Sequence, residues 1–179
     1  MIACGLDVSK RVAAVLAQAG APRPAHVWSG AWKYPDSELG RWAQDSALAW
    51  VRGELWDELA PAIDEANLVV VESPWLLPTH AARRKDPRWI TILAAMLIEL
   101  AGLCGLQGAR VTQVSPQLLS SATGCPKKSR PVVAHEVCIG LDLSQFAKGL
   151  QGDVADAAFL AYWGCTRVGA ASLRGGGEA

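Results

Sequence analysis

The chain has 179 residues, half of them hydrophobic, and its 17 basic residues balance 17 acidic ones. This length suits one domain with a substantial core. We expect no membrane span, because Glu99 and several small residues interrupt the most apolar stretch, residues 89–106. Asp7 stands where a signal peptide would need an apolar segment, and five scattered cysteines predict buried thiols in a reducing compartment. A cytoplasmic location is therefore expected.

The charges are unevenly distributed along the chain. Between Arg83 and Arg130, eight Lys or Arg residues stand against two acids, which leaves nine basic and fifteen acidic residues elsewhere. A local excess of this kind is what a phosphate-binding face needs. The neutral total, taken alone, instead favours ordinary solvated charges.

The first half of the chain predicts three strands followed by a helix. Residues 1–7 and 11–18 are apolar runs joined by a short turn, and residues 26–32 follow a break rich in Gly and Pro. A long helical stretch opens at Pro35, and one of its sides is acidic. We expect that helix to lie away from any nucleic acid.

The second half predicts alternating strands and helices. Residues 67–72 form the clearest strand and 73–87 a long loop, whereas 88–106 is a helix that is apolar almost all round. A strand is expected at residues 110–114, a short helix at 116–122 and a second helix that ends at 137. The last helix is expected at 154–165, followed by a tail at 169–179. The order of elements predicts an α/β domain with a mixed sheet over residues 1–168 and a flexible tail at 169–179.

Four carboxylates are placed where they can meet. Asp7 and Glu72 each end a short apolar run, and Asp153 and Asp156 are three residues apart, which puts both on one face of a helix. Clustered carboxylates repel one another, and a divalent cation removes that cost. Hard oxygen ligands of this kind suit Mg²⁺ or Mn²⁺. The structural alternatives are a turn residue for Asp7 and a helix N-cap for Asp153.

The ordered pattern resembles the RuvC family of Holliday junction resolvases, in the RNase H-like superfamily. The resemblance covers roughly residues 1–165 and rests on four segments: Gly-Leu-Asp7, Val-Val-Glu72-Ser-Pro-Trp75, Val114-Ser-Pro116 with Thr123-Gly124, and Asp153-Val-Ala-Asp156. It implies an RNase H-like sheet of five strands, strands 1–3 antiparallel and 4–5 parallel, flanked by helices. The opening Gly-Leu-Asp-Val-Ser-Lys is also similar to transposases that use a RuvC-like domain.

The resemblance also implies site residues and a reaction. Asp7, Glu72, Asp153 and Asp156 correspond to the family's four catalytic, metal-binding acids, which would hold two Mg²⁺ or Mn²⁺ ions with Asp7 as the bridging ligand. The implied reaction is metal-dependent hydrolysis of four-way DNA junctions by symmetric nicks that leave 5′-phosphate ends. Two departures are the low net charge and Gly124-Cys-Pro126 in place of the family's Gly-x-Gly.

Further residues are expected to contact DNA. Trp75 falls where the family often has an aromatic residue that meets the junction bases, although most of the eight tryptophans are expected in the core. The expected phosphate contacts are basic residues of the long loop and of the basic turn, namely Arg83, Arg84, Lys85, Lys127, Lys128 and Arg130. A solvated run of charges is the alternative for the loop cluster.

A homodimer is expected through the helix at residues 89–106, because one sheet covers only one stripe of it and symmetric cutting needs two active sites. Alternative functions are a nuclease of the same fold acting on structured RNA and a catalytically inactive module that binds branched DNA. An actin-like kinase is disfavoured, because that class needs two such domains and Gly-rich phosphate loops, which 179 residues are not expected to supply.

Overall fold

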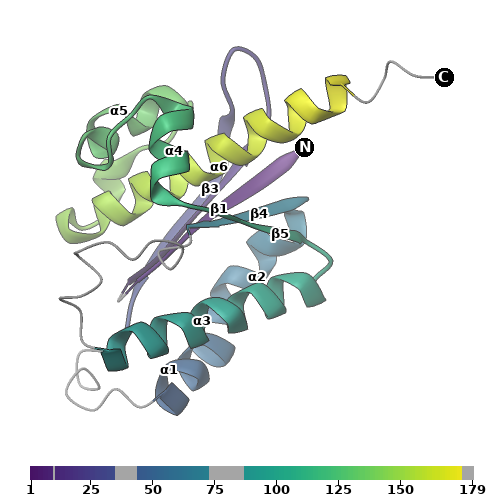
Figure 1. Cartoon of the computed structure of the whole chain (residues 1–179). Coiled ribbons are helices and arrows are strands. Elements are labelled where there is room, and N and C mark those ends of the chain that lie inside the picture. The colour runs from purple at the N-terminus through teal and green to yellow at the C-terminus, as the bar shows by residue number, and fades with distance from the viewer. Residues whose placement is uncertain (10, 35–43, 73–86, 175–179) are drawn as a thin grey trace.

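The protein is described by a computed structural model. It places residues 1–9, 11–34, 44–72 and 87–174, without the side chains of residues 44, 87–91 and 168–174. Within these ranges the chain folds as an α/β domain in which one sheet separates two groups of helices (Figure 1).

Five strands of the described chain form a single mixed sheet in the order β3-β2-β1-β4-β5. The strands are β1 (Ile2–Val8), β2 (Arg11–Gln18), β3 (Ala25–Lys33), β4 (Leu68–Glu72) and β5 (Arg110–Val114). The pairs β1–β2 and β2–β3 are antiparallel, whereas β1–β4 and β4–β5 are parallel. The predicted fold class is confirmed, and the sequence placed each strand within two residues of its observed ends.

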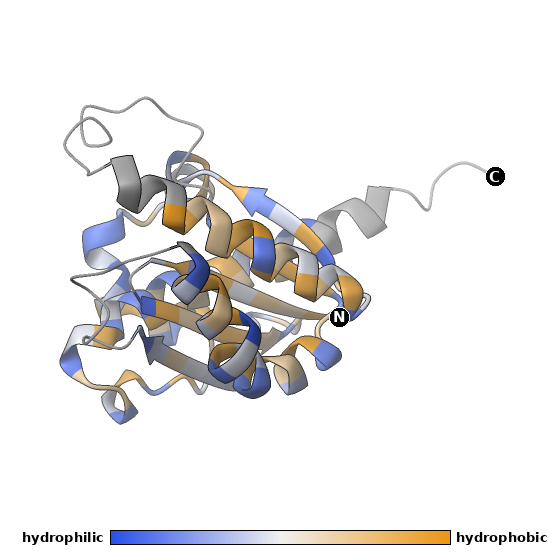
Figure 2. Ribbon diagram, turned by 90° about the horizontal axis from the view of Figure 1, so that it is seen from below, coloured by the Kyte–Doolittle hydropathy of each residue, from blue (hydrophilic) through white to orange (hydrophobic). Residues whose placement is uncertain are grey.

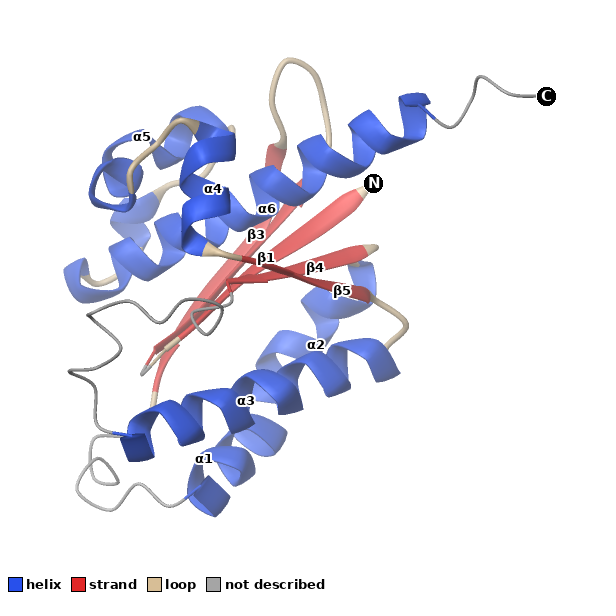
Figure 3. Ribbon diagram, in the orientation of Figure 1, coloured by secondary structure: helices blue, strands red, loops and turns tan. Residues whose placement is uncertain are grey.

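Helices cover both faces of this sheet (Figure 3). On one face lie α1 (Gln44–Trp50), a kinked segment (Val51–Leu55) that bends at Gly53, α2 (Trp56–Glu65) and α3 (Pro87–Leu106). On the other lie α4 (Pro116–Thr123), α5 (Arg130–Val137) and α6 (Lys148–Arg174), together with short 3₁₀ turns at Lys127–Ser129 and Leu143–Gln145. Helix α6 is longer at both ends than the predicted 154–165. The division into a domain ending at 168 and a flexible tail stays a prediction.

The alternating side chains of the strands separate two apolar layers. Cys4, Leu6 and Val8 of β1 join the core under α1, α2 and α3. Ala3 of β1 faces the opposite way and packs in the layer that contains the buried residues of α5 and α6. Apolar residues accordingly concentrate in the central strands and the helix faces that pack on them (Figure 2).

Helix α6 lies unusually close to β1. A Cβ atom added to Gly5 would lie 1.9 Å from the carbonyl oxygen of Ala157, and one added to Gly164 would lie 2.8 Å from Cγ2 of Val70. The buried face of α6 is rich in alanine, which allows this contact. The small residues therefore bring the first half of α6 against the end of β1 that carries Asp7.

Helix α3 has one buried face and one exposed face. Leu93, Met96 and Leu97 are buried in the core of their own chain, whereas Ile98 and Leu106 are 70% and 86% exposed. From Ile92 onward, the surplus apolar surface expected on this helix is therefore smaller than the sequence indicates, since most of the large side chains described there are buried. Among the described helices, none has the length and apolarity needed to cross a bilayer. All five cysteines are described and none forms a disulfide; four are buried and Cys125 is partly exposed.

Candidate functional site

Two of the four predicted acids stand at the carboxyl ends of adjacent parallel strands. The register pairs Leu6 of β1 with Val71 of β4, so Asp7 and Glu72 follow side by side. Strand alternation turns both side chains toward α6, because Ala3 and Val70, at even spacing from them, pack on that face. Both acids are buried.

The other two acids lie on the face of α6 that meets these strand ends. Asp156 is buried, and the side chain of Asp153 is 14% exposed. The alternative that Asp153 is the N-cap of the last helix is wrong, because α6 begins at Lys148, a full turn earlier. The three-residue spacing places both carboxylates on the same side of the helix, as predicted.

Asp7 lies within the electrostatic reach of the other three acids. Burial raises the pKa of Asp7 to about 8; the charge of Lys127 opposes the rise, and Asp156, Glu72 and Asp153 add to it. Burial likewise raises the pKa of Asp153, opposed by Arg11. The structure thus brings all four predicted acids into one neighbourhood, and it does so at the cost of burying negative charge.

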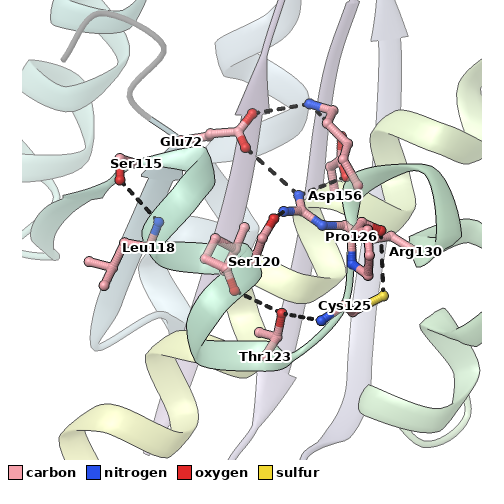
Figure 4. A network of polar contacts seen from close by, with 11 residues as sticks. Glu72, Ser115, Leu118, Ser120, Thr123, Cys125, Pro126, Arg130 and Asp156 are labelled. Carbon is pink, nitrogen blue, oxygen red and sulfur yellow. Dashed lines mark hydrogen bonds and ion pairs between the residues drawn. The ribbon is translucent and has the colours of Figure 1, made fainter. Parts of the chain in front are cut away.

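Two basic side chains form ion pairs within the group of acids. Nζ of Lys127 lies 2.7 Å from Oδ2 of Asp156 and 3.2 Å from Oε2 of Glu72. Nη1 of Arg130 lies 2.9 Å from Oδ1 of Asp156 and 3.7 Å from Oε1 of Glu72, and its Nη2 donates to Ser120 (Figure 4). Glu72 and Asp156 therefore share both cations.

The turn that carries these cations is built by local hydrogen bonds. Ser115 caps α4 by accepting from the backbone N–H of Leu118. Gly124 ends the helix with φ of 66°, which suits glycine, and Thr123 donates to Leu119 and accepts from the N–H of Cys125. The first glycine of the motif keeps a structural role even though a proline stands in the third position.

Arg11 is a part of the site that sequence reasoning missed. Its Nε lies 2.7 Å from Oδ2 of Asp153, and its Nη1 donates to the carbonyl oxygen of Gly149 in the first turn of α6. The guanidinium therefore ties β2 to the start of α6 and orients Asp153. Arg11 follows Asp7 by four residues, across the turn that joins β1 to β2, and this proximity was the signal in the sequence that Arg11 belongs to the site.

The three predicted phosphate contacts of the basic turn point in different directions. Arg130 is 0% exposed and its guanidinium contacts Asp156 and Ser120, and its contact with DNA phosphate stays a prediction. Lys127 turns toward the acids, and Lys128 is exposed. The predicted contacts Trp75, Arg83, Arg84 and Lys85 lie outside the described residues.

The donor set suits a hard divalent cation. Four carboxylates converge from three elements, and the position between Glu72 and Asp156 already holds a positive charge, the ammonium of Lys127. Among the described residues, however, no three carboxylate, imidazole or thiol side chains are yet arranged as a metal-binding group. The chemistry of the ligands fits the metal, and their arrangement is adapted to Lys127.

No protein-family model matches the chain, and neither does any curated protein. Solved structures are similar over nearly its whole length. T. thermophilus RuvC in complex with a Holliday junction substrate has a TM-score of 0.63 at 14% identity, covering 98% of this chain and 97% of that chain. The yeast mitochondrial Holliday junction resolvase Ydc2 has a TM-score of 0.68 at 15% identity, covering 97% of this chain and 81% of that one.

A third similar structure is the fowlpox virus resolvase with its substrate Holliday junction DNA, with a TM-score of 0.57 at 13% identity over 94% of this chain and 99% of that chain. At identities this low, the similarity is evidence for the fold alone. The observed strand order, the mixed sheet and the acids at the carboxyl ends of β1 and β4 agree with it. The chain therefore has the RNase H-like fold of the Holliday junction resolvases.

Proposed function

We propose that the protein is a structure-selective DNA endonuclease that resolves four-way junctions by metal-dependent phosphodiester hydrolysis, with symmetric nicks that leave 5′-phosphate ends. The observation that carries the proposal is the meeting of Asp7, Glu72, Asp153 and Asp156 at one edge of an RNase H-like sheet. Three of these acids are buried and Asp153 is nearly so, and gathering acids in this way is costly unless cations compensate their charge.

The comparisons support the choice of substrate. The T. thermophilus and fowlpox virus structures contain Holliday junction DNA, and this chain matches almost the full length of both proteins. Transfer of that substrate to this chain is our proposal, as are the predicted DNA contacts at Trp75, Arg83, Arg84, Lys85 and Lys128.

Each polar residue of the site has a task in this proposal. Asp7, Glu72, Asp153 and Asp156 hold Mg²⁺ or Mn²⁺, which when bound activates water and stabilises the leaving oxygen of the phosphodiester. Arg130 holds Asp156 in place from beneath, and Arg11 holds Asp153 from the side of β2. The two guanidinium groups thereby fix the directions in which the two α6 carboxylates point.

The decisive experiment offers the protein a synthetic four-way junction, a matched duplex, a single strand and a structured RNA, each with Mg²⁺ or with EDTA. We expect paired nicks in the junction with Mg²⁺, little cleavage of the linear DNAs, and none with EDTA. The nicked products should be ligatable, because a 5′-phosphate faces a 3′-hydroxyl. Binding of the junction without cleavage would support the inactive binding module, and preferred cleavage of RNA would support the RNA nuclease.

We also propose that the protein acts as a two-fold dimer through the exposed face of α3. Two equivalent strands of a junction are cut together only if two active sites are related by the same symmetry. The exposed face carries Ile98 and Leu106 with Gly102 and Gly105 between them, which allows two helices to approach closely. The pair Arg52–Glu99, with Nε and Oε1 2.6 Å apart, borders this face and ties α3 to the preceding helical layer.

Replacing Ile98 by Glu is expected to produce folded monomers that nick only one strand of a junction at a time. A charge placed on an apolar contact between subunits is left buried and unpaired in the dimer. Light scattering measures the mass, and a supercoiled cruciform substrate distinguishes single from paired nicks. Val27→Glu, at another exposed apolar residue on β3, is the matched control. A wild-type protein that is monomeric at micromolar concentration and cuts both strands together would contradict the dimer.

The same substitution at Leu93, Met96 or Leu97 tests something different. These side chains are buried within the chain, so a charge there is expected to unfold the domain and not to separate subunits. The dimer contact expected on this helix therefore involves its exposed side chains and not these three. Circular dichroism of Leu93→Glu beside Ile98→Glu distinguishes the two effects.

A further inference from the structure

The ammonium of Lys127 lies among the acids of the site and pairs with two of them. It lies within ion-pair distance of both Asp156 and Glu72, and it is the charge that most opposes the effect of burial on Asp7. The oxygens that it contacts, Oδ2 of Asp156 and Oε2 of Glu72, are ones that a hard divalent cation would need. An ammonium group and a metal ion cannot share these oxygens without strong repulsion.

The two cations of the cluster differ in whether they can leave. Arg130 is fully buried, bonded to Asp156 and Ser120, and its guanidinium carbon lies 5.6 Å from the centre of the Phe159 ring. The side chain of Lys127 is 58% exposed and extends from a short 3₁₀ turn at the surface. A lysine is a flexible, strongly hydrated point charge, so only Lys127 can swing out without opening the core.

The acids are arranged around this lysine and not as a set of metal ligands. Among the described residues, no three potential metal ligands lie together in a binding arrangement, although four carboxylates share the neighbourhood. Asp153 is held to one side by Arg11, while Glu72 and Asp156 are held by Lys127 and Arg130. Removal of the Lys127 ammonium would free one oxygen of Glu72 and one of Asp156.

We propose that Lys127 is an internal cation that blocks the metal site until DNA arrives. The ammonium of Lys127 then pairs with a phosphate of the bound strand, and the carboxylate oxygens that it leaves become available to Mg²⁺ or Mn²⁺. Metal and DNA consequently bind cooperatively, because each favours the conformation in which Lys127 has left the acids. The proposal rests on the proposed function, since its two ligands are those of a metal-dependent nuclease.

The test is the affinity for Mn²⁺ in the absence of DNA, measured by calorimetry on the wild type, Lys127→Met and the control Lys128→Met. Lys128 is exposed and is placed in no ion pair with another described residue. We expect Lys127→Met to bind Mn²⁺ about tenfold more tightly than the wild type, within the range usual for coupling between two ligands. Lys128→Met is expected to keep the wild-type affinity for Mn²⁺, and Lys127→Met to bind the junction more weakly in EDTA.

The expected change in Mn²⁺ affinity is opposite in direction to the change expected if Lys127 merely supports the site. If Lys127 only stabilised the fold or the acids, its loss would weaken or leave unchanged the binding of Mn²⁺, and either result would overturn the proposal. Absence of Mn²⁺ binding in all variants would overturn it as well. Lys127→Gln provides a second variant should the methionine form unfold. Junction cleavage by the wild type in Mg²⁺ is scored separately, so failure of this proposal leaves the proposed function standing.

Discussion

Asp7→Asn is expected to lower metal-dependent junction cleavage severely while leaving a folded protein that still binds the junction. Asp7 is buried beside the other three acids, and an amide at this position cannot supply the ionised oxygen that a bound metal ion would need, although the shape of the side chain is kept. Loss of one group from an electrostatic site of this kind lowers rates by about a hundred- to a thousandfold. Cleavage is measured on a labelled junction in Mg²⁺, and binding by gel shift in EDTA.

The same substitution is expected to stabilise the protein in the absence of metal. Burial raises the pKa of Asp7 from an ordinary 3.8 to about 8, so between these pH values the folded state binds more protons than the unfolded chain. Stability of the wild type therefore falls as pH rises from about 4 to about 8. Asparagine has no such titration, so Asp7→Asn should have a flatter profile and a higher Tm than the wild type at pH 8 in EDTA. Added Mn²⁺ should raise the Tm of the wild type and not of the variant.

The other acids provide a graded comparison. Glu72→Gln and Asp153→Asn are expected to lose cleavage and remain folded, because each keeps hydrogen-bonding groups for its partner. Asp156→Asn is expected also to lose stability, by about 3 kcal/mol, because it takes the charge partner from the fully buried Arg130. Full activity in two or more of the four variants would contradict the assignment of the site.

The acids were predictable from sequence because their positions follow from strand and helix periodicity. Asp7 and Glu72 each end an apolar run, and the carboxyl ends of parallel neighbours meet at one edge of a sheet. The spacing of Asp153 and Asp156 needs only a helix, whose observed start did not alter their common face. Local pattern and topology agree at these residues, so the prediction did not depend on detailed packing.

The contacts of Lys127 and Arg130 with the acids were not predictable, because the directions of these side chains depend on a turn whose form the sequence does not reveal. Lys127 and Arg130 are three residues apart across a 3₁₀ turn that continues into α5, so both side chains point to the acids, and Lys128 does not. The residue types alone suggested three equivalent phosphate contacts. Burial of Arg130 becomes visible only when Glu72, Asp156 and Ser120 are placed around it.

Gly5→Ala is expected to destabilise the protein by at least about 3 kcal/mol, at the upper end of the usual cost of overpacking. The new Cβ would lie 1.9 Å from the carbonyl oxygen of Ala157 and 2.4 Å from the backbone nitrogen of Ala161. These are backbone atoms of α6, which no change of rotamer can move aside. Helix α6 must therefore shift away from β1, and it carries Asp153 and Asp156 with it.

Unfolding in guanidinium chloride measures this loss, with Gly152→Ala as the matched control. Gly152 lies on the same helix with nothing within 4 Å of the added Cβ, so alanine there should stabilise α6 by about 0.5–1 kcal/mol. A Gly5→Ala protein as stable as the wild type would mean that α6 does not lie as close to β1 as described. In whatever fraction of Gly5→Ala remains folded, Mn²⁺ affinity should fall, because the α6 acids no longer face Asp7 and Glu72 at the same distance. The absence of a side chain at Gly5 thus allows the acids of α6 to meet those of β1 and β4.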